Sequence, residues 1–241
     1  MKICFGKIVT SACFAVAAFR LLSADAVTGY VYTPGDKGYV DTRLRIDTAS
    51  FTVEAWVYAT ATPVDNMIFS QYGNVKMPFD FAFRLRGEEG NMPGVFWRGA
   101  APGGGNLSLL GTAAVALNTW THVAAVCDGE SHTLTIYVNG TAAGSCSVAD
   151  GAIPVQADVL RIGNLNGTGC MGFSGLLMEA RLWSVARSAI EIGVTKDVVL
   201  SEPQSGLVGC WPLSRARGGA TIKALNRAGG EDGVLEIQGM R

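Results

Sequence analysis

Two alternating apolar runs joined by a short polar turn constrain this chain more than any other feature. The first run covers residues 120–126, the second covers 134–138, and Asp128-Gly129-Glu130-Ser131 lies between them. Alternation of apolar and polar residues predicts half-buried strands. Asn139-Gly140 then tolerates the positive φ angles of a tight hairpin turn, and a third run follows at 142–148. Residues 120–148 are therefore predicted to form a three-stranded antiparallel meander.

Short alternating runs recur along most of the chain. In residues 51–58, Phe51, Val53, Ala55 and Val57 alternate with Thr52, Glu54, Trp56 and Tyr58. This predicts a strand with one face in the core, and residues 81–86 alternate in the same way. Charged residues make up only 16% of the 241 residues and glycine numbers 31, which suits many strands and tight turns. Residues 188–194 are the exception, because Ser188 and Glu191 have the spacing of a helix capping box.

Four stretches share a further sequence pattern: Phe51–Val57, Trp120–Val123 with Ile136–Gly140, Leu160–Gly163, and Phe173–Gly175 leading to Glu179–Trp183. In this order they resemble the laminin-G-like family, the concanavalin A-like lectin/glucanase jelly rolls. A fifth stretch, Gly206–Leu213, resembles the strand that often follows or opens such a module. The resemblance covers about residues 29–213 and implies an all-β, two-sheet antiparallel β-sandwich that binds carbohydrate or protein outside the cell. The fold also includes glycoside hydrolases, so it does not by itself decide the function.

Residues 1–26 have the features of a secretory signal peptide. Lys2 and Lys7 give a positive start, residues 8–19 are apolar, and Ala24-Asp25-Ala26 fits the cleavage rule for small residues. The apolar run is shorter than the roughly 20 residues that span a bilayer. We therefore expect cleavage near Val27, a secreted or cell-surface protein, and no membrane span after cleavage.

The chain then divides into a laminin-G-like domain, residues 27–200, and a C-terminal segment, residues 201–241. From Ser214 to the end, only Val234–Ile237 suggests another strand. The segment either packs back on the sandwich or begins a truncated second module. The balance of 19 Lys and Arg against 20 Asp and Glu gives no electrostatic case for nucleic acid as a partner. The pattern leaves the oligomeric state open.

Four cysteines follow the signal segment: Cys127, Cys146, Cys170 and Cys210. Export permits disulfides. Cys127 and Cys146 lie on the outer strands of the meander, about 9.6 Å apart at two strand spacings, beyond the roughly 7 Å that a disulfide allows. Pairing of Cys170 with Cys146 or Cys210 stays open, as does the alternative that all four are small buried side chains.

The sequence gives little support for catalysis. Glycoside hydrolysis needs two carboxylates about 5–10 Å apart, and the Glu-x-Asp-x-x-Glu motif of glucanases with this fold is absent. Glu54 and Glu179 are the only carboxylates inside strong strand patterns, and we expect Glu54 to be structural. The chain has only His122 and His132 and no Gly-x-Ser-x-Gly motif. We therefore expect a protein that is not an enzyme.

Calcium is the cofactor that the family resemblance implies. Related domains hold it between an acid of an N-terminal loop and an acid of the strand after Phe-Ser-Gly. Carboxylate oxygens are ligands that Ca²⁺ prefers. On that basis Asp36 and Glu179 are the candidate ligands. The chain departs from the family pattern because Met178, and not a second acid, precedes Glu179.

A sugar site on a sandwich combines aromatic rings with amide and guanidinium groups. The candidates at strand ends and loop edges are Tyr72, Trp97, Arg98, Asn164 and Asn166. Trp97 is the best of them because Arg98 and a Gly-rich loop follow it, although it could also lie in the core. We expect the other tryptophans, Trp56, Trp120, Trp183 and Trp211, to be in the core.

The function that follows is an exported binding module for carbohydrate or a glycosylated surface protein. The alternative is a structural or assembly protein of the same fold without a sugar ligand. A glycoside hydrolase is the third and weakest hypothesis.

Overall fold

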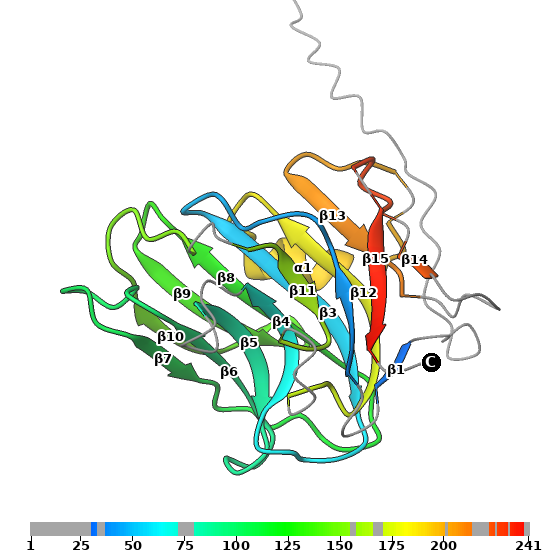
Figure 1. The fold of residues 1–241 in the computed structure, drawn as a ribbon. Helices are drawn as coiled ribbons and strands as arrows, with labels where there is room; N and C mark the ends of the chain where they lie inside the picture. The colour runs from blue at the N-terminus through cyan, green and yellow to red at the C-terminus, as the bar shows by residue number, and fades with distance from the viewer. Residues whose placement is uncertain are drawn as a thin grey trace, which may run out of the picture.

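The computed structural model describes residues 30–32, 37–71, 80–154, 158–165, 171–200, 202–213, 222–224, 226–230 and 232–238. These residues form two antiparallel sheets packed face to face, with one short helix, α1, on the outer side (Figure 1). The predicted all-β sandwich is confirmed. The described part of the chain contains no helix long and apolar enough to cross a membrane.

The first sheet has seven strands. Its order is β1 (Tyr30–Tyr32), β12 (Gly175–Trp183), β3 (Phe51–Ala59), β8 (Thr121–Asp128), β9 (Thr133–Val138) and β10 (Thr141–Ser147), with β13 (Leu207–Trp211) also paired to β12. Strands β8, β9 and β10 are the predicted meander. Cys127 and Cys146 both align with Leu134 of the strand between them, and the cysteines Cys127, Cys146 and Cys210 are free. Cys170 lies outside the described residues.

The second sheet has eight strands. Its order is β14 (Ile222–Ala224), β15 (Gly233–Gln238), β2 (Lys37–Asp41), β11 (Leu160–Ile162), β4 (Asn66–Gln71), β5 (Phe81–Arg86), β6 (Met92–Trp97) and β7 (Leu107–Leu110). The C-terminal segment thus adds β13 to one sheet, and β14 and β15 to the other. Trp211 of β13 is fully buried in the shared core. The described part of this segment packs back on the sandwich.

The core lies between the sheets and follows the alternation in the sequence. Phe51, Val53, Ala55 and Val57 of β3 are all fully buried in it. The Trp97 ring packs edge-on against Phe51 across the sandwich at 5.6 Å, and against its cross-strand neighbour Phe81 in the same sheet at 5.9 Å, measured between ring centroids. Such aromatic pairs add stability beyond the area they bury. The preceding residue of β6, Phe96, faces the opposite way and is half-buried.

Helix α1 (Ala189–Thr195) begins at the capping box that the sequence predicts. Ser188 Oγ accepts a hydrogen bond from Glu191 N, and the Glu191 carboxylate accepts one from Ser188 N. Ile192 packs on Ala124 and Val126 of β8. The helix therefore covers the outer face of the seven-stranded sheet, the face that Thr52, Glu54, Trp56 and Tyr58 share.

Strand β12 carries a bulge that the sequence does not reveal. Its register with β3 shifts between Met178 and Arg181, and Glu179 has a φ of 49°. Leu177 before the bulge and Ala180 and Leu182 after it all belong to the core. Because side chains otherwise alternate along a strand, the bulge leaves Glu179, Arg181 and Trp183 on the outer face.

Candidate functional site

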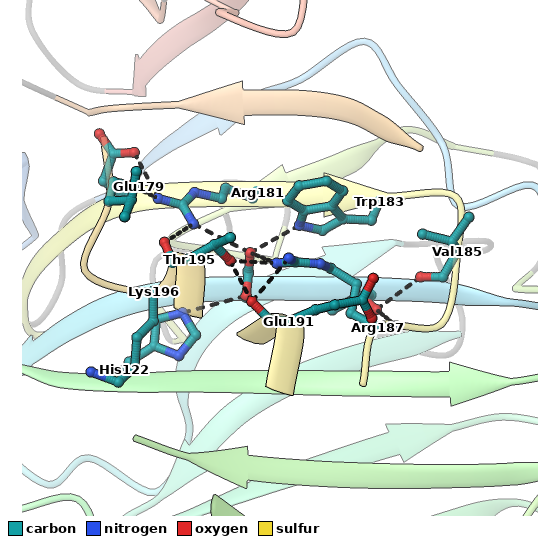
Figure 2. A network of polar contacts seen from close by, with 12 residues as sticks. His122, Glu179, Arg181, Trp183, Val185, Arg187, Glu191, Thr195 and Lys196 are labelled. Atoms are coloured by element: carbon teal, nitrogen blue, oxygen red, sulfur yellow. Dashed lines mark hydrogen bonds and ion pairs between the residues drawn. The ribbon is translucent and has the colours of Figure 1, made fainter. Parts of the chain in front are cut away.

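A network of polar side chains that includes Arg181, Trp183 and Arg187 lies beneath α1 (Figure 2), and these three residues donate hydrogen bonds to Glu54. The side chain of Glu54 is fully buried. Its Oε1 accepts hydrogen bonds from Trp183 Nε1 at 2.9 Å, Arg187 Nη1 at 3.2 Å and Arg181 Nη1 at 3.5 Å. A buried carboxylate is tolerated when charged donors surround it in this way.

The two arginines connect Glu54 to the segment that covers it. Arg187 donates to Thr195 Oγ1 at 2.8 Å and to the Glu191 carbonyl at 3.0 Å, and its guanidinium lies 4.0 Å from the centroid of the Trp183 ring. Arg181 donates to the carbonyl oxygens of Thr195, at 3.0 Å, and Val198. These contacts hold α1 and the segment after it against the sheet.

His122 is the remaining neighbour of Glu54, with Nε2 3.5 Å from Oε2. Burial lowers the pKa of His122 to about 4, despite the nearby Glu54 carboxylate. Burial alone would raise the pKa of Glu54, but the positive groups and the Trp183 N–H around it lower it instead. Since His122 is neutral at pH 7, Arg181 and Arg187 are the cations that keep Glu54 ionised there. With Glu54 0% and His122 1% exposed, this constellation is structural and no substrate reaches it.

Glu179 is the described member of the predicted calcium pair. Its Oε2 accepts a hydrogen bond from Arg181 at 3.2 Å, and its Oε1 lies 3.6 Å from Arg227 Nη1. Both oxygens thus face guanidinium groups, which fits a calcium ligand poorly. No group of three potential metal ligands occurs among the described residues, and Asp36 lies outside them. Calcium stays a prediction, and melting in calcium against a chelator would test it by mass action.

The described members of the predicted sugar site, Trp97, Arg98 and Asn164, do not form one exposed surface. Trp97 is 1% exposed in the core, so the expectation that it forms a stacking platform is wrong. Arg98 points to the other face of the sheet and pairs with Asp80 at 3.4 Å. Asn164 is fully buried, and its Oδ1 accepts a hydrogen bond from Leu165 N at 2.7 Å. Tyr72 and Asn166 lie outside the described residues.

Two tryptophans that the sequence analysis assigns to the core lie at the surface. Trp56 and Trp120 are half-buried, as is Tyr58, and the Tyr58 and Trp120 rings are 5.5 Å apart. The signal was present, because Trp56 and Tyr58 alternate with the core residues of β3. Trp183 and Trp211 are buried as expected. The three half-buried aromatic side chains are thus on the seven-stranded sheet, and Trp97 is not among them.

The outer face of the eight-stranded sheet is polar but internally paired. The Arg161 guanidinium lies over the Tyr39 ring and forms two hydrogen bonds with Asp158, at 2.7 and 3.1 Å. Arg84 and Arg86 lie 3.1 and 3.5 Å from the Asp65 carboxylate. The arginines of this face are therefore matched by carboxylates and do not form a positive patch.

The two sheets form a jelly-roll sandwich, and the buried network around Glu54 holds helix α1 on its outer face. Residues 26–193 match the sequence model of the concanavalin A-like lectin/glucanases superfamily, and the chain belongs to this superfamily. The predicted family is thus confirmed. Strands β13 to β15 lie beyond the matched residues.

Similar proteins point to the same fold. Pentraxin-related protein PTX3 of Homo sapiens is 29% identical over 182 residues, covering 71% of this chain and 45% of that protein. The chain thus spans about half the length of the curated relatives it matches.

Two solved structures are also similar. A protein from Bacteroides ovatus ATCC 8483 assigned to carbohydrate binding has a TM-score of 0.67 at 23% identity, over 83% of this chain and 56% of that one. The CBM40 of the Ruminococcus gnavus IT-sialidase, bound to α2,3-sialyllactose, has a TM-score of 0.56 at 18% identity, over 70% and 96%. At these levels of sequence identity, the structural similarity shows that the proteins share a fold.

Proposed function

We propose that this chain is an exported, non-catalytic module that binds carbohydrate or a glycosylated surface protein. Membership of a lectin-type superfamily supports binding, as does the likeness to the Bacteroides protein and to the Ruminococcus CBM40. The observation that carries the proposal of a non-catalytic module is the burial of the two carboxylates that lie on strands. Glu54 and Glu179 are both buried and held by arginines, so they form no acid pair open to a substrate.

The experiment combines binding and turnover on one preparation. The chain starting at Val27 is applied to an array of neutral and sialylated glycans and incubated with β-glucans. We expect glycan binding without release of reducing sugar. Turnover that disappears in Glu54→Gln or Glu179→Gln would show that the protein is an enzyme. Export is tested separately by N-terminal sequencing of secreted protein, which should begin near Val27.

One observation favours the alternative function, assembly without a sugar ligand. Ile190 and Val194, one turn apart on α1, are 77% and 64% exposed, and exposed apolar side chains of this kind are typical of contact surfaces. If assembly is the function, Ile190→Ser with Val194→Ser should change the mass measured by light scattering. Unchanged mass together with glycan binding would exclude this alternative.

A further inference from the structure

Three aromatic side chains form a half-buried group on the outer face of the seven-stranded sheet. We call Trp56, Tyr58 and Trp120 the aromatic shelf. The Tyr58 and Trp120 rings lie 5.5 Å apart at an interplanar angle of 51°. Trp56 precedes Tyr58 by two residues and therefore points to the same face. The segment before helix α1 covers Thr52 and Glu54, while the three shelf residues stay half-buried.

The shelf is held in place by its surroundings. Trp56 Nε1 donates to the Lys196 carbonyl at 2.6 Å, and the His122 ring packs against the Trp56 ring at 5.6 Å. The turn before Trp120 is tied to the end of β3 by the hydrogen bond from Asn118 N to Ala59 O, 2.8 Å long. Rings fixed before a ligand arrives lose little conformational entropy on binding.

The described surface around the shelf is polar. Thr60, Asn118 and Thr119 are exposed beside it and offer hydroxyl and amide groups. Lys196 lies over the Trp56 ring and pairs with Asp197, so that these two charges offset each other. Apolar ring faces beside uncharged hydrogen-bonding groups match a sugar, which has a C–H face and hydroxyl groups at its edge.

We propose that the aromatic shelf is a saccharide-binding site that takes an uncharged pyranose by its C–H face. The sugar stacks on Tyr58 and Trp120, and its hydroxyl groups reach Thr60, Asn118 and Thr119. The proposal rests on the binding function above and adds a location and a class of sugar. It places the site beside α1 and away from the loop that follows Trp97.

The experiment titrates the protein with neutral gluco-, galacto- and manno-oligosaccharides, and with lactose against α2,3-sialyllactose. Tyr58→Ala and Trp120→Ala should each weaken binding roughly tenfold, because each removes a stacking surface. Tyr58→Phe keeps the ring and should bind as the wild type does. Tyr137→Ala is the matched control, since Tyr137 is half-buried on the same sheet outside the shelf. Melting curves confirm that each variant is folded.

Intrinsic fluorescence gives a second measurement that does not depend on the alanine variants folding. Saturating oligosaccharide should change the tryptophan emission, and the change should shrink in Trp120→Phe. If the wild type binds but Tyr58→Ala and Trp120→Ala bind equally well, the shelf is not the site, although the binding function stands. If sialyllactose binds more tightly than lactose, the uncharged class is wrong. If no oligosaccharide binds, both proposals fail.

Discussion

At the scale of single residues, Glu54 shows how one buried charge organises its surroundings. The Oε1 atom of its carboxylate accepts hydrogen bonds from three residues that are far away in the sequence, Arg181, Trp183 and Arg187. Removing one partner of a buried charge leaves part of its desolvation cost uncompensated. The side chains around Glu54 should therefore contribute to stability through specific hydrogen bonds as well as through packing.

Trp183→Phe tests one of these bonds. The variant removes the indole N–H that Glu54 accepts at 2.9 Å, and we expect a loss of about 1–3 kcal/mol in the free energy of unfolding at pH 7. Trp211→Phe is the control, because the buried Trp211 Nε1 has no hydrogen-bond partner among the described residues. The free energy of unfolding in urea is measured for both variants, and the difference between the two losses gives the contribution of the hydrogen bond. Equal losses would mean that packing alone explains the effect.

His122 should make stability depend on pH. Its folded pKa is about 4, against about 6.5 in an unfolded chain. Between these values the unfolded chain binds more protons, so the free energy of unfolding falls as pH drops from 6.5 to 4, by at most about 3 kcal/mol. In His122→Gln this part of the pH dependence should disappear. His132→Gln, at an exposed histidine, should keep the wild-type profile.

At the scale of elements, the seven residues of α1 are too few to be stable as an isolated helix. The helix persists because Ile192 packs on β8 and because Arg187 connects the Glu191 carbonyl and the Thr195 hydroxyl group of the helix to Glu54. Tertiary contacts, and not helix propensity, therefore hold this element.

Two isoleucines on the helix separate these contributions. Ile192 is fully buried, so Ile192→Ala should cost about 2–5 kcal/mol. Ile190 is 77% exposed, so Ile190→Ala should stay within about 0.5 kcal/mol of the wild type. Thermal unfolding measures both changes. Similar values for the two variants would contradict the observed orientation of α1.

Much of the fold was predictable because alternation is a local property. The faces of β3, the meander and the capping box follow from residues close in the sequence. The position of the aromatic residues was not predictable from motifs, because the face of its strand decides whether a tryptophan is buried. Trp97 lies two residues after the buried Val95 and therefore faces the core, whereas Trp56 lies two residues after Glu54 and shares its outer face. The bulge at Glu179 could not be predicted, because it depends on how β12 meets β3 and β13.

At the scale of the whole molecule, the sandwich is completed from both ends of the described chain. Strand β1 pairs with the first half of β12 and β13 pairs with its second half, while β15 covers β2 of the other sheet. Residues beyond the matched region 26–193 thus supply strands to both sheets and Trp211 to the core. The folding unit extends past the part recognised by the family.

A chain ending at residue 200 should therefore fail to fold cooperatively. It lacks β13 to β15, and it leaves the core positions of Trp211 and Leu213 empty. We expect a broad thermal transition and binding of a hydrophobic dye, compared with one sharp transition for the full chain. Trp211→Ala in the full chain should cost about 3–5 kcal/mol and remain cooperative. A sharp transition in the shortened chain would show that residues 26–200 fold alone.

The bulge in β12 absorbs one residue more than the register with β3 requires. Met178 pairs with Trp56 and Arg181 with Glu54, so two residues of β12 stand opposite Ala55 alone. Deleting Glu179 would give a regularly alternating strand in which Ala180 and Leu182 still point into the sandwich and Arg181 and Trp183 still point out of it. The deletion would remove the carboxylate that lies between Arg181 and Arg227 but would keep the inner and outer faces of the strand. Homologues that keep helix α1 in this position can therefore differ in length by one residue at this point of β12.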